Sequence, residues 1–220
     1  MAASMETARP QILLLSLQRK DFFDEMYSKL LEDLLSKATV QRVSKSTTAL
    51  KYLSENTPHA ILVTDPAITK SKYRDVLTQV ISYARRGGRV VIAGHFSSFV
   101  LPLDLDRFFR VDWDLEWSKG EYQRTTVHLN RDVPQVSKEG LALAYSQKAV
   151  FLKGVVQSAR LYSPSSDSIT ESHVFAPGPI EDLTETAVVF SAVGDGWLGY
   201  MGDVNAEDAS QPVVVAMCGL

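Results

Sequence analysis

The most constraining feature of the sequence is a regular alternation of short apolar runs with amphipathic segments up to Ala93. Four short runs are typical of strands buried in a parallel sheet, and they cover residues 11–17, 39–43, 60–64 and 90–93. Between them, apolar side chains recur as on one face of a helix, over residues 21–35, 46–53 and 72–86. Strands that alternate with helices predict an α/β fold. We expect a doubly wound, mostly parallel sheet with helices on both faces, which is a three-layer sandwich.

The ends of these strands predict where a ligand would bind. A strand order of 2-1-3-4 places the switch point between the first and third strands, and ligands bind at the carboxyl ends of strands near such a point. Ser16 follows the first strand, Asp65 follows the third, and His95 follows the fourth after a sharp turn that Gly94 permits. We therefore expect Ser16, Asp65 and His95 to line one crevice.

The second half of the chain is less regular. Pro102 can open a helix, and residues 123–129 alternate as in a half-buried strand. Residues 133–154 are ambiguous, with a partly helical pattern near residues 141–145. Residues 163–168 combine Ser, Pro and Asp and predict a surface loop.

The end of the chain predicts closely spaced strands. Gly194-Asp195-Gly196 is typical of a hairpin turn between the first two of them, and the three cover residues 187–192, 196–201 and 213–217. Trp197 and Tyr200 could form a homodimer contact if this hairpin lies at an exposed edge. With no linker or repeat in view, we expect one domain over residues 1–220, with residues 1–10 as a loose leader.

Composition excludes several classes of partner and site. The chain has 220 residues and a formal net charge of -3, without a local run of Lys and Arg, so nucleic acid is not an expected partner. Cys218 is its single cysteine, which rules out an internal disulfide and a cysteine-based zinc site. The apolar run 12–15 is too short for a signal peptide or a membrane span. We therefore expect a soluble, cytoplasmic protein that does not associate with membranes.

Three segments carry a resemblance to a known family. They are the elbow Gly94-His95-Phe96-Ser97-Ser98, the hairpin over residues 188–200, and Asn205-Ala206-Glu207. With the alternating first half, they resemble the class I glutamine amidotransferase-like superfamily, in particular the trehalose-utilisation-like proteins and a domain of some β-galactosidases. This resemblance implies a flavodoxin-like fold that ends in a β-hairpin.

The same resemblance implies a change of activity. Enzymes of that superfamily carry a cysteine on a Gly-x-Cys-x-Gly elbow and complete the site with His-Pro-Glu. Here the elbow holds His95 and no cysteine, and Asn205-Ala206-Glu207 stands where His-Pro-Glu would be. An activated thiolate needs a thiol beside a base, so we expect a divergent branch without glutaminase activity that retains Glu207.

Each candidate residue also has a structural interpretation. His95 is either a base or ligand group, or a histidine that hydrogen-bonds within a polar turn. Ser97 is either a nucleophile or, like Ser98, a helix cap, and capping is favoured. Asp203, Asn205 and Glu207 either face the crevice or stabilise a turn, and Cys218 is expected to be a small buried residue.

No metal or cofactor is expected. Asp112, Asp114 and Glu116 fall at alternate positions and would share one face of an extended strand. This face could be a metal or acid–base cluster, but a solvent-exposed face is favoured. The intervening Trp113, Leu115 and Trp117 would then point inward. The histidines lack zinc spacing. No phosphate-cradling or Gly-x-Gly-x-x-Gly loop follows the first strand, so flavin and nicotinamide cofactors are disfavoured.

Two functions remain open on the sequence. In the first, the domain has lost glutaminase chemistry and binds a small polar ligand or a protein partner in the crevice. In the second, it is an enzyme of altered chemistry, a hydrolase or isomerase-like protein acting on a small carbonyl, ester or sugar-like substrate. His95 would be its base, supported by Glu207 and by Asp65 or Ser97. A Glu207 carboxylate close to the His95 ring would favour the enzyme.

Overall fold

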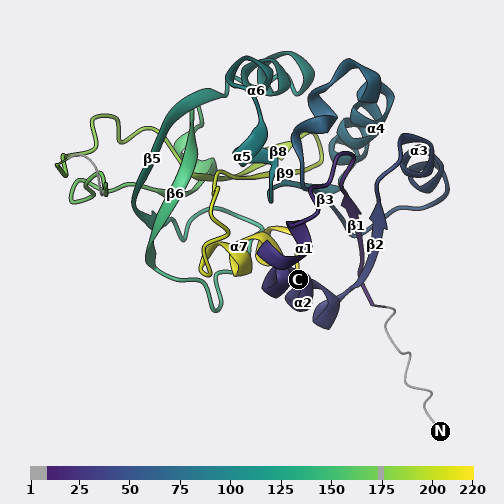
Figure 1. Ribbon diagram of the computed structural model, residues 1–220, viewed down its shortest axis with the longest axis horizontal. Coiled ribbons are helices and arrows are strands. Elements are labelled where there is room, and N and C mark those ends of the chain that lie inside the picture. The colour runs from purple at the N-terminus through teal and green to yellow at the C-terminus, as the bar shows by residue number, and fades with distance from the viewer. Residues whose placement is uncertain (1–8, 173–175) are drawn as a thin grey trace, which may run out of the picture.

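The computed structural model describes residues 9–172 and 176–220, so most of the expected leader lies outside the described residues. The described residues form one mixed nine-stranded sheet in the order β2-β1-β3-β4-β9-β8-β7-β5-β6 (Figure 1). The parallel half consists of β1 (Gln11–Leu15), β2 (Thr39–Val43), β3 (Ala60–Val63), β4 (Arg89–Ile92) and β9 (Gly196–Met201). The predicted order of the first four strands, 2-1-3-4, is confirmed.

Helices cover both faces of this parallel half. Alternate residues of β1 point to opposite faces, with Leu14 in one core cluster and Leu13 in the other. Figure 1 shows α3, α4 and α6 above the sheet and α1, α2 and α7 below it. Their bounds are α1 (Phe23–Met26), α2 (Ser28–Lys37), α3 (Ser46–Glu55), α4 (Arg74–Arg85), α5 (Phe96–Phe99), α6 (Pro102–Arg107) and α7 (Ser210–Met217).

The other half of the sheet is antiparallel, so the prediction of a mostly parallel sheet is wrong. It consists of β8 (Val188–Val193), β7 (Arg160–Ser163), β5 (Ser118–Leu129) and β6 (Ala144–Lys153), and β8 also pairs antiparallel with β9. The reason is the connections. The short Gly194-Asp195 turn can join only antiparallel strands, because a parallel pair needs a crossover of a dozen or more residues. The hairpin prediction is confirmed.

The antiparallel half curls back on itself. The outer edge of β6 does not stay free, since the Val150 amide donates to Gly202 O at 2.9 Å and the Leu152 amide donates to Thr186 O at 2.9 Å. The Val204 amide donates to Lys148 O at 3.0 Å. These bonds bring the β5–β6 hairpin against the turn that follows β9, so residues of β5 reach the edge of the sheet where the expected site lies.

Two predicted elements have a different structure. Residues 213–217 form most of α7 rather than a strand, because a fully buried apolar run has the same composition in either structure. The predicted helix over residues 21–35 is divided into α1 and α2 at Tyr27, whose backbone is not helical (φ -112°, ψ 26°). This break places the Tyr27 ring beneath the turn that carries His95.

Three further expectations are corrected. Residues 141–145 lead into β6 and are not helical. The acidic alternation is not a strand, because a π-helical turn (Phe108–Asp112) precedes it and Asp114 has a φ of 58°. The β8–β9 hairpin lies inside the sheet and Tyr200 is buried, so it offers no exposed edge for a homodimer.

Candidate functional site

A crevice lies at the carboxyl ends of β1, β3 and β4. Its walls come from the segments that follow these three strands, and it encloses about 330 Å³. The residues that line it are Gln18, Lys20, Asp65, Pro66, Ala67, Thr69, Lys70, His95, Phe99, Leu101 and Asp104. Asp65 and His95 thus meet here. Ser16 lies behind the wall, where its buried hydroxyl is 2.6 Å from the hydroxyl of Thr64.

His95 is enclosed by aromatic rings and is only 1% exposed. Four ring centroids lie 4.8 to 5.4 Å from its own, those of Phe22, Phe23, Tyr27 and Phe99. Neither ring nitrogen has a hydrogen-bond partner among the described residues. Burial lowers the pKa of His95, and the charge of Lys20 lowers that pKa further. The imidazole is therefore neutral, with one donor and one acceptor nitrogen.

The aromatic enclosure is thin on the crevice side. Phe22 and Phe99 are 48% and 45% exposed, whereas Phe23 and Tyr27 are buried in the core. Phe99 lines the crevice, whereas Phe22 does not. A movement of the Phe99 ring would give a ligand in the crevice access to a neutral imidazole without disturbing the core.

Asp65 fixes the shape of the crevice. Its two carboxylate oxygens accept hydrogen bonds from the amides of Gln18 at 3.0 Å and Ala67 at 2.9 Å, which ties the loop after β1 to the turn after β3. Burial raises the pKa of Asp65, and these bonds partly offset that effect. A carboxylate engaged in this way positions the walls and is not free to act as a base.

Two lysines stand on the rim of the crevice. Lys70 Nζ donates to Gln18 Oε1 at 2.6 Å, and Lys20 Nζ lies 5.1 Å from the centroid of the Phe99 ring. Lys20 ends the loop 16–20 that the sequence predicts at the crevice, whereas Lys70 was not predicted. The available signal was its position in the loop that follows one of the two strands flanking the switch point.

The residues expected to assist His95 are engaged elsewhere. The Ser97 hydroxyl donates to Met201 O at 2.8 Å, and Ser97 lies within α5, so it is neither an activated nucleophile nor a helix cap. The Glu207 carboxylate forms an ion pair with Arg124 of β5, which the sequence analysis did not single out. Because neither His95 nitrogen has a partner, no carboxylate of the described chain orients the ring.

Asp203 organises the turn after β9. Its carboxylate accepts the amide of Asn205 at 2.7 Å and that of Glu207 at 2.8 Å. Burial raises the pKa of Asp203. The Asn205 side chain lies 3.4 Å from Glu207 Oε1. These contacts fit the turn interpretation of the three residues, since they hold Glu207 toward Arg124 rather than toward His95.

The remaining candidates do not form a site. The Asp112 side chain is 1% exposed and pairs with Arg74, and Asp114 and Glu116 are exposed. Trp113 and Trp117 point inward as expected. Within residues 9–172 and 176–220, no group of three His, Cys, Asp or Glu side chains is placed to hold a metal ion. None of the helices in these same residues has the length and apolar character to cross a membrane.

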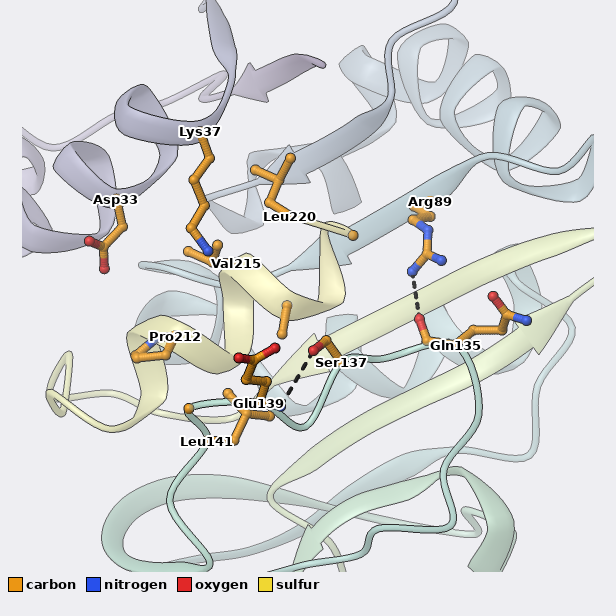
Figure 2. Close-up of a pocket in the computed structure, with 13 residues that line it drawn as sticks. Asp33, Lys37, Arg89, Gln135, Ser137, Glu139, Leu141, Pro212, Val215 and Leu220 are labelled. Atoms are coloured by element: carbon orange, nitrogen blue, oxygen red, sulfur yellow. Dashed lines mark hydrogen bonds between the residues drawn. The ribbon is translucent and has the colours of Figure 1, made fainter. Parts of the chain in front are cut away.

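A separate cavity of about 660 Å³ lies at the opposite edge of the sheet (Figure 2). Its charged residues balance, with Lys37 and Arg89 against Asp33 and Glu139. The Arg89 guanidinium donates to Gln135 O at 2.9 Å. In Figure 2 the lysine and arginine come from different sides of α7 and do not converge on one point, so this cavity defines no ligand chemistry.

The chain is similar in structure to several solved proteins. A ThuA-like protein from Bacteroides uniformis is 14% identical with a TM-score of 0.57, and the match covers 99% of this chain and 93% of that one. A ThuA-like protein from Parabacteroides merdae is 13% identical with a TM-score of 0.54, covering 96% and 89%. The β-galactosidase from Bacillus circulans sp. alkalophilus is 12% identical with a TM-score of 0.58. That match covers 97% of this chain but 32% of the galactosidase.

These likenesses concern the fold. The present chain shares the fold of these ThuA-like neighbours. The sequence matches no protein-family model and no curated protein.

Proposed function

We propose that this chain is a divergent glutamine amidotransferase-like domain that lacks glutaminase activity and binds a small polar ligand in the crevice. The observation that carries the proposal is His95, a neutral and buried imidazole on the crevice wall whose two nitrogens have no partner in the described chain. A buried polar atom without a hydrogen-bond partner costs free energy. A ligand that hydrogen-bonds to the His95 ring removes this cost, and the recovered free energy favours binding.

The loss of glutaminase chemistry is supported by the position of the only thiol. Cys218 lies at the end of α7 and is fully buried, and burial raises the pKa of its thiol to about 12. A nucleophilic cysteine instead requires a lowered pKa and access to substrate. The elbow residue that faces the crevice is His95.

The crevice also suggests the character of the ligand. Two carboxylates also line the crevice, but Asp65 accepts two backbone amides and Asp104 lies 3.9 Å from the Arg107 guanidinium. Lys20 and Lys70 form no ion pair among the described residues and therefore favour a negative charge on the ligand. The imidazole offers one donor and one acceptor, and the Phe99 ring offers a flat apolar surface. A small hydroxylated anion, such as a sugar acid or a sugar phosphate, combines these features.

The test is a binding titration by calorimetry with gluconate, glucose 6-phosphate and glucose. We expect the anions to bind and His95→Phe, which keeps an aromatic ring in place, to weaken binding about tenfold or more through the lost hydrogen bonds. Lys37→Gln at the opposite edge of the sheet is the matched control and should bind as the wild type does. Unchanged binding by His95→Phe, or no binding by any of the three, would contradict the proposal.

The enzyme of altered chemistry is the second candidate, and the lowered pKa of His95 favours it, because a general base must be neutral. The engaged Glu207, Asp65 and Ser97 weigh against it. Hydrolysis of a p-nitrophenyl ester that disappears in a folded His95→Ala variant would establish the enzyme and overturn simple binding.

A further inference from the structure

A second cavity lies on the other side of α5 and encloses about 430 Å³. The segment from His95 to Leu105 separates it from the crevice. His95, Phe99 and Leu101 line the crevice, whereas Ser98, Val100 and Leu105 line the second cavity. Its far wall comes from the curled β5–β6 hairpin and from the turn after β9. The two cavities therefore share the wall formed by residues 95–105. Only the second cavity is also lined by strands of the antiparallel half.

The charge on the lining of this second cavity is positive. Among the described residues that line it, Lys119 is the only charged one. The Lys119 ammonium donates to Gly120 O at 2.6 Å, which leaves two of its three donors for other partners. Lys148 adds a second positive charge nearby, because its ammonium lies 5.2 Å from the centroid of the Tyr122 ring that lines the cavity.

Two carboxylates near this cavity have other partners. Asp106 accepts the backbone amide of Lys119 at 2.6 Å, and Glu207 is paired with Arg124. Neither one lines the cavity. The Lys119 ammonium is therefore not neutralised by an ion pair within the described chain.

Most of the remaining wall is apolar. Val100, Leu105, Val150 and Val204 provide aliphatic surface, and the Ser98 hydroxyl lies a long 3.4 Å from its acceptor, Val204 O. A volume of this size suits a small organic molecule, and such sites combine an apolar lining with a few polar groups that fix orientation. A single lysine, Lys119, beside an aliphatic wall favours a ligand with one anionic end and an apolar body.

We propose that this second cavity binds a small organic monocarboxylate, with its carboxylate on Lys119 and its apolar body against Val100, Leu105 and Val150. The site is distinct from the crevice of the proposed function and does not depend on it. Ser98 and Asn205 also line the cavity, and their present hydrogen bonds are long, at 3.4 Å to Val204 O and to Glu207 Oε1.

The test uses phenylacetate and its uncharged analogue phenylacetamide, titrated into the full chain and followed by protein NMR chemical shifts. We expect phenylacetate to bind about tenfold or more tightly than the amide, because a hydrogen bond to a charged group is the stronger one. Lys119→Gln should remove that difference. Lys51→Gln on α3 is the control, because that lysine is exposed and lies on a helix that does not line the cavity.

A second variant keeps the proposal falsifiable if Lys119→Gln is unstable. Val100→Phe fills the cavity and should abolish binding of phenylacetate, whereas His95→Phe should leave that binding unchanged. Equal binding of the acid and the amide would overturn the proposal. So would a retained preference for the acid in Lys119→Gln, retained binding by Val100→Phe, loss of binding in His95→Phe, or the absence of chemical-shift changes at millimolar phenylacetate.

Discussion

At the scale of single residues, His95 makes folding sensitive to pH. Its pKa is about 6.5 in the unfolded chain and lower in the folded protein, because burial disfavours the imidazolium. Below pH 6.5 the unfolded chain thus takes up a proton that the folded protein does not. Stability is fully present above that pH and falls as the pH drops, by at most about 1.4 kcal/mol per pH unit. We expect urea unfolding to show this loss between about pH 7.5 and pH 5.5, and to show less of it in His95→Phe.

The comparison with His95→Phe isolates this effect. Asp65 and Asp203 have raised pKa values, so their contribution runs the other way and diminishes as the pH rises above their unfolded value. Both proteins carry these carboxyl groups, and their effect cancels in the difference. If the wild type and His95→Phe lost stability equally in acid, the pKa of His95 would have to be the same in the folded and the unfolded protein.

Cys218 gives a second prediction at this scale. Its thiol is fully buried at the end of α7, and burial raises its pKa to about 12, so almost no thiolate forms near neutral pH. We expect no reaction of the native protein with a thiol-specific reagent, and complete reaction after denaturation. Cys218→Ser supplies the blank. Rapid labelling of the native protein would mean that α7 opens readily.

Residue roles were only partly predictable. Strand topology predicts that His95, which follows the fourth strand, lies at the same crevice as the ends of the first and third strands, and the structure places it there. Its aromatic enclosure depends on the break at Tyr27, which periodicity does not reveal. The partner of Glu207 could not be predicted either, because Arg124 is 83 positions away and reaches it only through the curl of β5 and β6.

At the scale of elements, the β8–β9 hairpin packs its turn closely against the end of α4. A Cβ added to Gly196 would lie 2.1 Å from Ala84 O and 2.3 Å from Gly88 O, and both are backbone atoms that cannot move aside. We expect Gly196→Ala to destabilise the protein by about 3 kcal/mol or more in urea unfolding. Gly178→Ala is the control, since an added Cβ there meets nothing within 4 Å. Similar stability of both variants would contradict this packing.

Elements were predictable where apolar periodicity is clear and ambiguous where it is absent. The helical repeat in α4 has one interpretation, and this helix forms close to its predicted bounds. The run from Val213 to Met217 is buried on all sides, and burial of that kind suits a strand and a helix equally. Its helix follows from packing against α2, which is a tertiary contact.

At the scale of the whole molecule, the first four strands are neighbours in the chain, whereas β4 pairs with the distant β9 and β6 closes against the turn that follows β9. The first four strands follow one another through short helical crossovers, so their order follows from general rules. The position of β6 depends instead on bonds from Val150 and Leu152 to Gly202 and Thr186, which join segments far apart in the chain. No local pattern encodes that closure.

The continuous sheet predicts that both halves unfold together. Each core cluster contains residues of both, as Leu14 and Phe151 share one and Leu13 and Leu152 share the other. Far-UV circular dichroism reports mainly the helices of the first half. Tryptophan fluorescence reports the second half of the chain, in which Trp113 and Trp117 precede β5 and Trp197 lies in β9, between β4 and β8. We expect the two urea unfolding curves to coincide, as for a single cooperative unit.

A core substitution in the first half tests this coupling directly. Leu14 is 1% exposed within β1, and Leu14→Ala should cost about 2–5 kcal/mol through lost burial and the cavity left behind. Because the lost contacts lie in a core that both halves share, the tryptophan signal of the second half should shift to lower urea by the same amount as the circular dichroism. A shift confined to circular dichroism would instead mean that the parallel and antiparallel halves are separate folding units joined by one pair of strands.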